Sequence, residues 1–288
     1  MLTVLAPAKL NLTLEVLAKR RDGFHEVRSV IQTINLCDSL RLQLSQNIEF
    51  KSDAPNWIPG ESLVAKATSL LQEVTGSTKG ATIEVSKRIP LVSGLGGDSS
   101  NAAAILRGLN KLWELGLSLK ELLELAAKLG SDVAFFLYGG TALVKGRGEM
   151  VTPLPPLPRM WIVLVVPNMP RLPRKTEQLY AGLKVNHYTD GRITERLVEE
   201  LRKGREFTPS LLFNTFENIT FAGSSELRVY KGHIIKMGAT NVHLAGSGPT
   251  LFSMIKDKAQ AEDLYIRCQQ QNLETYLTET LAGIEEVE

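Results

Sequence analysis

Strict alternation of apolar and polar residues over positions 9–16 predicts a β-strand near the start of the chain. Leucine or valine occupies every even position of this stretch, and the odd positions carry Lys9, Asn11, Thr13 and Glu15. The pattern is typical of a half-buried strand, so Lys9 and Asn11 can point from its polar face into a cleft. After a turn at Asp22-Gly23, similar patterns predict extended stretches at 27–36, 40–44 and 81–87.

Apolar residues spaced three and four positions apart predict helices in the first half of the chain. The first helix covers 62–75 and the last covers 118–130. Between them, a helix begins near residue 101 and runs to about Leu115. Ser118 and Glu121 form a capping box at the start of the last helix, and Gly130 ends it. Residues 135–144 are apolar but contain Gly139-Gly140, which favours a short helical turn followed by a strand.

The second half of the chain mixes helices with short strands. Helices are predicted at 175–184, 192–203, 225–237 and 258–271, and strands at 161–166, 241–245, 250–255 and 273–281. This succession is typical of a small, mainly antiparallel sheet covered by helices, and the fold class is therefore α+β. Four prolines between residues 153 and 158 cannot continue a helix or a central strand, so the predicted domains are 1–152 and 160–288.

Composition restricts the class of protein. The 288 residues are 43% apolar, which is enough for a sizeable core, and the formal net charge is only +2. Basic residues are scattered, whereas a nucleic-acid-binding protein concentrates them on one face. The two cysteines and four histidines show no disulfide or metal-ligand pattern, so no metal-binding residues are predicted. Without a membrane-spanning run or a signal peptide, we expect a cytoplasmic protein that binds neither nucleic acid nor membrane.

The stretch from Gly94 to Ser100 places three glycines and two serines directly before a helical pattern. Glycine lets the backbone approach a ligand closely, and a helix N-terminus offers unpaired N–H groups and a positive dipole end. Together these features favour phosphate binding. The spacing is neither that of a Walker A loop nor that of a dinucleotide fold. A flexible turn with a serine N-cap is the alternative interpretation.

Three separated segments, Pro7–Leu12, the Gly94–Ser100 loop and Gly246–Thr250, occur in an order that resembles the three motifs of the GHMP kinases. The resemblance covers nearly the whole chain. Further similarity lies in Arg21–His25, Lys87–Pro90 and Leu129–Val133. These segments are similar to the branch of the family that acts in the non-mevalonate pathway of isoprenoid synthesis.

The resemblance implies a two-domain fold with the active site between the domains. The N-terminal domain would resemble ribosomal protein S5 domain 2, and the C-terminal domain would be a ferredoxin-like α/β-plait. ATP would be the phosphoryl donor, with Mg²⁺ as helper. The acceptor would be the 2-hydroxyl of the methylerythritol part of a cytidine diphosphate sugar alcohol. These small molecules are the expected partners, and the protein would be a monomer or a weak homodimer.

The resemblance assigns catalysis to Lys9 and Asp132. Asp132 would be the general base, and the Lys9 ammonium would stabilise charge on the acceptor oxygen or the transferring phosphoryl group. The local sequence also allows Asp132 to be the N-cap of a helix that begins at Val133, and Lys9 to be a solvated strand lysine.

The remaining site residues follow from the same motifs. The residues expected to bind ATP are Pro90, Val92, Gly94, Leu95, Gly96, Gly97, Asp98, Ser99 and Ser100. The residues expected to bind the acceptor are Asn11, Phe24, His25, Asp132, Tyr180, Gly246 and Ser247. Phe24 and Tyr180 would stack on the cytosine ring, and His25 would read its edge, although core packing of the two aromatic residues is an equal alternative.

Two residues depart from the family pattern. Asp98 stands where glycine is common, and it would cap the helix, face solvent, or repel phosphates unless a cation intervened. Ala134 replaces a frequent proline and should alter local stiffness more than chemistry. Two other functions stay open at this point: another GHMP kinase such as a homoserine kinase, and a non-catalytic nucleotide-binding module.

Overall fold

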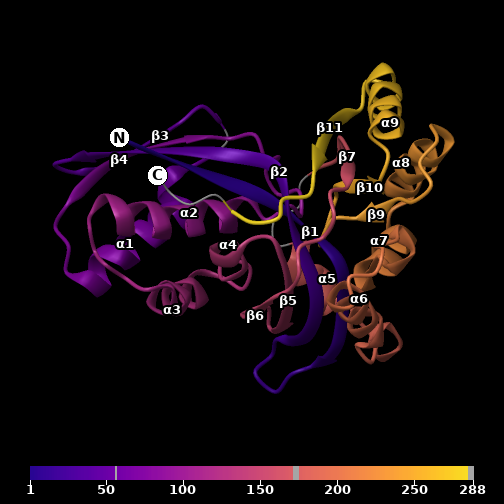
Figure 1. Ribbon diagram of the computed structural model, residues 1–288, viewed down its shortest axis with the longest axis horizontal. Coiled ribbons are helices and arrows are strands. Elements are labelled where there is room, and N and C mark those ends of the chain that lie inside the picture. Colours follow the sequence, from indigo (N-terminus) through magenta and orange to yellow (C-terminus); the bar gives the residue numbers. More distant parts are fainter. Residues whose placement is uncertain (56, 171–174, 285–288) are drawn as a thin grey trace.

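The computed structural model describes residues 1–55, 57–170 and 175–284, which form two sheets with helices packed against them (Figure 1). The first sheet has seven strands in the order β3-β4-β2-β1-β8, with β5 paired to β2 and β6 to β5. Its strands are β1 (Leu2–Lys19), β2 (His25–Ser45), β3 (Ile48–Ser52), β4 (Gly80–Ser86), β5 (Thr141–Gly146), β6 (Met150–Pro153) and β8 (Phe213–Asn214). Because β2 is 21 residues long, its first part pairs with β5 and its last part with β4.

Four helices pack on one face of this sheet (Figure 1). They are α1 (Leu63–Thr75), α2 (Gly97–Leu112), α3 (Leu119–Leu129) and α4 (Phe135–Tyr138), and the 3₁₀-helix η1 (Pro59–Glu61) precedes α1. Helix α2 lies close to the sheet because its buried side has only small residues at several positions. A Cβ atom at Gly108 would lie 2.4 Å from Leu42 Cδ1, so a larger residue here would force the Leu42 side chain to move.

The second sheet has four antiparallel strands in the order β11-β7-β10-β9. They are β7 (Trp161–Val166), β9 (His243–Leu244), β10 (Leu251–Ile255) and β11 (Glu274–Glu279). The helices of this half are α5 (Lys175–Ala181), α6 (Arg192–Arg202), α7 (Thr215–Gly223), α8 (Ser225–Lys236) and α9 (Lys258–Gln270), with the 3₁₀-helices η2 (Val185–His187) and η3 (Pro209–Leu211). The predicted small antiparallel sheet of the second half is thus confirmed.

Strand β1 is buried on both faces, so the prediction of a half-buried strand is wrong. Helix α2 covers one face, and the other packs against α6 and against Ile162 and Leu164 of β7. Even Glu15 is fully buried, and its Oε2 accepts a hydrogen bond from the Thr194 backbone N–H at 2.7 Å. A register shift between Asn11 and Thr13 interrupts the alternation, so Leu14 lines the same cleft as Lys9 and Asn11. Thr13 and Glu15 instead contact Thr194 of α6, which is remote in the sequence.

The other predicted elements are present within a few residues of their expected ends. The capping box of Ser118 and Glu121 forms as predicted, and α1 ends at Gly76 in the left-handed conformation. The stretches predicted at 27–36 and 40–44 form one continuous strand, β2. The short strands β3, β6 and β8 and the helix α7 were not predicted. Segment 154–160, which contains most of the prolines of the predicted boundary, has no regular structure.

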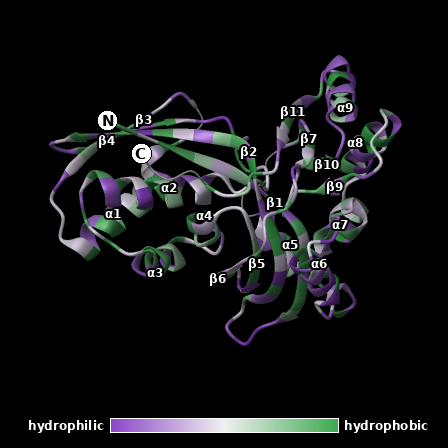
Figure 2. Cartoon of the chain, in the orientation of Figure 1, coloured by the Kyte–Doolittle hydropathy of each residue, from purple (hydrophilic) through white to green (hydrophobic). Residues whose placement is uncertain are grey.

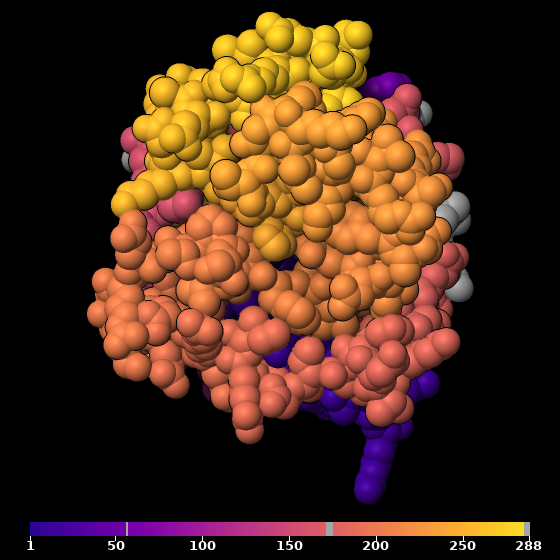
Figure 3. Space-filling view, turned by 90° about the vertical axis from the view of Figure 1, so that its right-hand side faces the viewer, coloured from indigo at the N-terminus to yellow at the C-terminus, as the bar shows by residue number. Residues whose placement is uncertain are grey.

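The turn between β1 and β2 projects beyond the rest of the molecule and is hydrophilic, as the indigo extension in Figure 3 and the purple loop in Figure 2 show. The strands that lead to this turn carry the apolar residues of the core. Among the described residues, no helix is both long and apolar enough to cross a membrane.

Candidate active site

Two polar residues that are far apart in the sequence meet in a cleft of about 350 Å³. Lys9 of β1 and Asp132, in the turn before α4, lie with Nζ 3.5 Å from Oδ2. The Lys9 side chain is buried, whereas that of Asp132 keeps 36% of its surface exposed, so a ligand can reach the carboxylate. Helix α4 begins at Phe135 with Ala134 as its N-cap, so Asp132 does not cap a helix.

The orientation of Lys9 is fixed by polar contacts along β1. Its Nζ donates to Asn11 Oδ1 at 2.6 Å, and its backbone N–H donates to the Leu95 carbonyl at 2.9 Å. The Asn11 amide nitrogen donates to Ser29 Oγ at 2.8 Å, and that hydroxyl donates to the Thr13 carbonyl. The oxygen of Asn11 is therefore held toward the ammonium, and Lys9 is fixed against the glycine loop.

The glycine loop curves around a second, smaller cavity of about 140 Å³. Gly94 and Gly96 have φ angles of 84° and 75°, which only glycine adopts at low cost, and α2 begins directly after Gly96. Of the nine residues predicted to bind ATP, seven line this cavity: Pro90, Val92, Gly94, Gly96, Gly97, Asp98 and Ser99. Leu95 and Ser100 are buried and do not line it.

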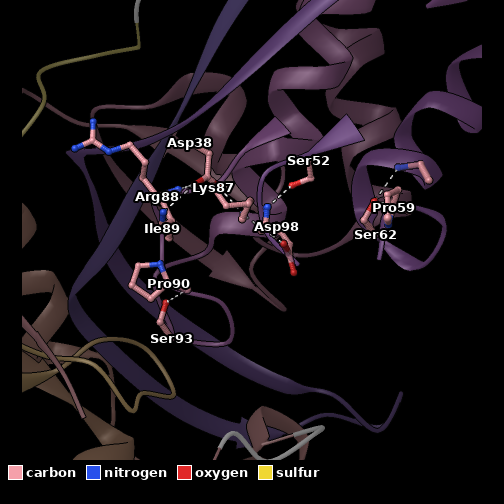
Figure 4. A network of polar contacts seen from close by, with 12 residues as sticks. Asp38, Ser52, Pro59, Ser62, Lys87, Arg88, Ile89, Pro90, Ser93 and Asp98 are labelled. Atoms are coloured by element: carbon pink, nitrogen blue, oxygen red, sulfur yellow. Dashed lines mark hydrogen bonds and ion pairs between the residues drawn. The ribbon is translucent and has the colours of Figure 1, made fainter. Parts of the chain in front are cut away.

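A buried ion pair fixes the start of the glycine loop (Figure 4). Asp38 of β2 is fully buried, and its Oδ1 accepts hydrogen bonds from the backbone N–H groups of Arg88 and Ile89 at 2.7 and 2.8 Å. Its other oxygen accepts from Lys87 Nζ. The same ammonium lies 3.8 Å from Asp98 Oδ1, at the far end of the loop. Lys87 is thus the cation beside Asp98, and α2 has no side-chain cap.

The second glycine motif forms the turn between β9 and β10, opposite the loop. Gly246, Ser247 and Gly248 line the large cleft, and a Cβ atom at Gly246 would lie 3.3 Å from Lys9 Nζ. Asn214 holds this turn, because its amide nitrogen donates to the carbonyls of Leu244 and Gly246 at 2.9 and 2.8 Å. The structure therefore brings Lys9 and both glycine motifs together.

The residues predicted to bind a pyrimidine ring differ in their position relative to the cleft. The rings of His25 and Tyr180 stack with centroids 4.9 Å apart, and Tyr180 packs edge-on against Phe216. Phe24 is half-exposed on the hairpin, where the Arg147 guanidinium lies 4.8 Å from its ring centroid. Burial and the nearby Lys19 lower the pKa of His25, which favours the neutral imidazole. Tyr180 lines the large cleft, whereas Phe24 and His25 do not.

Comparison with known proteins agrees with this geometry. Residues 62–140 match the GHMP kinases N terminal domain. A protein of Dehalococcoides mccartyi named 4-diphosphocytidyl-2-C-methyl-D-erythritol kinase is 48% identical over 99% of this chain and 100% of its own length. The chain belongs to the GHMP kinases, in the family of the 4-diphosphocytidyl-2-C-methyl-D-erythritol kinases. The protein of that name from Geobacillus kaustophilus is 40% identical over 92% of this kinase and 91% of its own length.

Solved structures of other kinases share the fold of this kinase. A crystal structure of a 4-(cytidine 5'-diphospho)-2C-methyl-D-erythritol kinase is 31% identical and covers 96% of this kinase and 98% of its own chain, with a TM-score of 0.82. A homoserine kinase from Cytophaga hutchinsonii, at 19% identity and a TM-score of 0.66, shares the fold. The predicted α+β GHMP kinase fold is confirmed, and the chain is an ATP-dependent phosphotransferase.

Two cationic residues of the cleft were not predicted from the sequence. Arg147 and Lys175 both line the cavity that contains Lys9 and Asp132. Glycines on both sides of Arg147 are a local signal that could have identified a turn at the site. For Lys175 no such signal exists, because a lysine at the start of a helix is usually solvated.

Replacing Gly94 by alanine in this kinase is expected to lower the free energy of unfolding by about 3 kcal/mol, through positive-φ strain and a steric clash. The added Cβ would lie only 2.1 Å from the Ala245 carbonyl oxygen, at a φ angle of 84°. Urea unfolding checks the loss of stability. Gly116→Ala is the matched control, because Gly116 also has a positive φ, 68°, but no atom within 4 Å of the added Cβ. Equal losses in the two variants would contradict the predicted clash.

Replacing Asp38 by asparagine is expected to destabilise the kinase by about 3–5 kcal/mol, because the Lys87 ammonium would stay buried without its closest counter-ion. The KM for ATP should also rise, since the asparagine oxygen can still accept from Arg88 and Ile89 but its amide nitrogen would face the Lys87 ammonium, which displaces the start of the glycine loop. Urea unfolding and ATP titration of the initial rate measure the two effects. Asp98→Asn, at the exposed end of the same network, should change stability by less than about 1 kcal/mol. A stable Asp38→Asn variant with an unaltered KM would disprove the positioning role.

Proposed function

We propose that this kinase transfers the γ-phosphoryl group of ATP to the 2-hydroxyl of 4-(cytidine 5'-diphospho)-2-C-methyl-D-erythritol. The observation that carries the proposal is the Lys9–Asp132 pair, which lies between the glycine loop and the glycine turn in one cleft. The names of relatives that match the chain over its full length support this choice of acceptor.

In this proposal Asp132 is the general base. As the acceptor oxygen forms its bond to the γ-phosphorus, Asp132 takes the hydroxyl proton, and the bond between the γ-phosphorus and the bridging oxygen of ADP breaks. The partly exposed carboxylate suits this role because an alcohol can approach it from the cleft. Lys9 orients the carboxylate and stabilises negative charge on the oxygens around the transferring phosphorus.

ATP would place its phosphates in the cavity of the glycine loop, where backbone N–H groups and the start of α2 favour anions. Mg²⁺ fits the same place, since the Asp98 carboxylate and the Ser99 hydroxyl line the cavity and Mg²⁺ binds carboxylate, hydroxyl and phosphate oxygens. When bound, it neutralises charge on the phosphates. The Lys87 ammonium beside Asp98 limits repulsion between that carboxylate and the nucleotide.

The cytidine end of the acceptor would lie near Phe24, His25 and Tyr180. The half-exposed ring of Phe24 offers a stacking face, and Tyr180 supplies an aromatic wall of the cleft. Because His25 already stacks on Tyr180, a base would insert beside this pair rather than between its rings. Asn11, Gly246 and Ser247 are the proposed contacts for the rest of the acceptor.

We also propose a fold for each of the two domains. Residues 1–152 would form a domain that resembles domain 2 of ribosomal protein S5, and residues 160–288 a ferredoxin-like domain. The strand order β11-β7-β10-β9 with intervening helices supports the second assignment. A cytoplasmic enzyme that acts as a monomer or weak homodimer completes the proposal.

Turnover of ATP with two acceptors tests the function. The kinase should release ADP with the cytidine diphosphate acceptor and show no activity with homoserine. The phosphorylated product is identified by mass and by the ³¹P spectrum. Phosphorylation of homoserine alone, or ATP binding with no turnover of either alcohol, would overturn the proposal.

A further inference from the structure

Lys175 places a cationic side chain in the active-site cleft at a point that the proposed reaction does not use. It is the first residue of α5, and it lines the same cavity as Lys9 and Asp132. A Cβ atom at Gly248 would lie 3.2 Å from Lys175 Nζ, so the ammonium lies against the glycine turn. The next residue, Thr176, fixes this position, because its hydroxyl lies 2.8 Å from that of Ser247.

The Lys175 ammonium differs from the other buried lysines of the site. Lys9 pairs with Asp132, and Lys87 pairs with Asp38, whereas Lys175 forms no ion pair or side-chain hydrogen bond within the described residues. Burial lowers the pKa of Lys175 to about 8. A half-buried ammonium without a counter-ion is costly, and a bound anion would remove that cost.

The charges of the cleft indicate which kind of ligand would neutralise the Lys175 ammonium. In the described part of the chain, the charged residues that line the cavity are the cations Lys9, Arg147 and Lys175 and the single carboxylate Asp132. This excess of positive charge favours an anion with more than one negative charge. The backbone beside Lys175 has no side chain at Gly248, so a phosphate oxygen can approach the ammonium closely.

We propose that Lys175 binds a phosphate oxygen of a polyphosphate ester in the cleft and thereby sets the affinity for that ligand. Two polyphosphate esters enter the proposed reaction, namely the triphosphate ATP and the cytidine diphosphate acceptor, and Lys175 holds one of them. This inference rests on the proposed function for its choice of ligands. Lys175 is a binding residue, distinct from the pair Lys9 and Asp132 at which the proton is transferred.

Replacing Lys175 by methionine keeps most of the side-chain volume and removes the charge. The KM for one of the two polyphosphate esters should rise about tenfold to a hundredfold, and kcat should change less than about threefold. The ligand whose KM rises identifies the one that Lys175 holds. Lys175→Arg should restore most of the affinity, since a guanidinium also binds phosphate. Lys66→Met is the matched control, because Lys66 is exposed on α1 and lines neither cavity.

The pH dependence separates a phosphate contact from a structural role. The ammonium is present below about pH 8 and is lost above it, so the affected KM should rise with pH in the unmodified kinase. In Lys175→Arg this rise should disappear, because a guanidinium stays protonated. The other ionisable groups that face the same cavity, Lys9, Asp132, Arg147 and Tyr180, are present in both proteins. A pH profile shared by the two proteins would overturn the assignment.

A direct measurement of ligand binding tests the role of Lys175 separately from the proposed function. Calorimetry with ATP and with cytidine 5'-diphosphate gives the Kd of each probe for the kinase, the methionine variant and the control. A Kd that rises about tenfold for one probe in Lys175→Met alone supports the inference, even if the cytidine acceptor is not turned over. Unaltered Kd values for both probes in a folded Lys175→Met variant would overturn it, while turnover by the unmodified kinase would leave the proposed function intact.

Discussion

Replacing Asp132 by asparagine is expected to lower kcat about 10²-fold or more, because asparagine cannot accept the proton of the attacking hydroxyl. The loss corresponds to about 2.7 kcal/mol or more in the activation free energy. The side chain keeps its shape, and 36% of the Asp132 surface is exposed, so the fold should survive the exchange. The KM values should change little, since the glycine loop and the glycine turn remain in place.

The measurement is the initial rate at saturating ATP and acceptor, with thermal unfolding as a check of the fold. Asp263→Asn is the control, because it also removes a carboxylate from an ion pair, that with Arg267 on α9, outside both cavities. The control should keep the activity of the unmodified kinase. A folded Asp132→Asn variant with nearly normal kcat would remove Asp132 from the mechanism.

Replacing Lys9 by methionine is expected to lower kcat by about two to three orders of magnitude, because the ammonium acts on charge that develops during the transfer. Its surroundings fix the position of this ammonium. Lys9 is buried, and its Nζ lies near Asn11 Oδ1 and the Asp132 carboxylate. With methionine, the carboxylate would lose the cation that orients it.

A second variant shows that the position of the charge matters as well as its sign. Lys9→Arg should restore little activity, since the glycine backbones lie close to the Lys9 side chain and a longer guanidinium would carry its charge away from the position of the ammonium. A Cβ atom at Gly96 would lie 3.1 Å from Lys9 Cγ, and one at Gly246 would lie 3.3 Å from Lys9 Nζ. Steady-state kinetics of both variants, with ATP binding measured separately, tests this. Near-normal kcat in Lys9→Met would contradict the role of the ammonium, and full activity in Lys9→Arg would contradict the role of its position.

Several elements of the site were predictable because local rules determine them. The glycine loop before α2 combines residues that permit positive φ with a helix N-terminus, and both signals lie within ten residues. The turn at Gly246–Gly248 is local in the same sense. The pairing of Lys9 with Asp132 came from motif resemblance, since no periodicity connects a strand near the start with a turn before α4.

The buried polar residues outside the motifs show the limit of such rules. Asp38 is one of several polar residues along a long strand, and nothing nearby indicates that it accepts hydrogen bonds from Arg88 and Ile89. Glu15 belongs to an alternating strand, yet α6 covers it. Lys175 begins a short helix with no special composition. Each of these roles depends on a partner that the fold brings from another part of the chain.

The sequence by itself determined the positions of the main helices and strands and of the two glycine turns, and the resemblance of its motifs to a known family predicted Lys9 and Asp132 as the reacting side chains. Periodicity, capping and turn chemistry act over a few residues and can be recognised without the fold. Only the tertiary structure decided that β1 is covered on both faces, that Asp38 holds the glycine loop, and that Lys175 enters the cleft. Distances between remote segments are set by how the sheets and helices pack, and no local pattern records them.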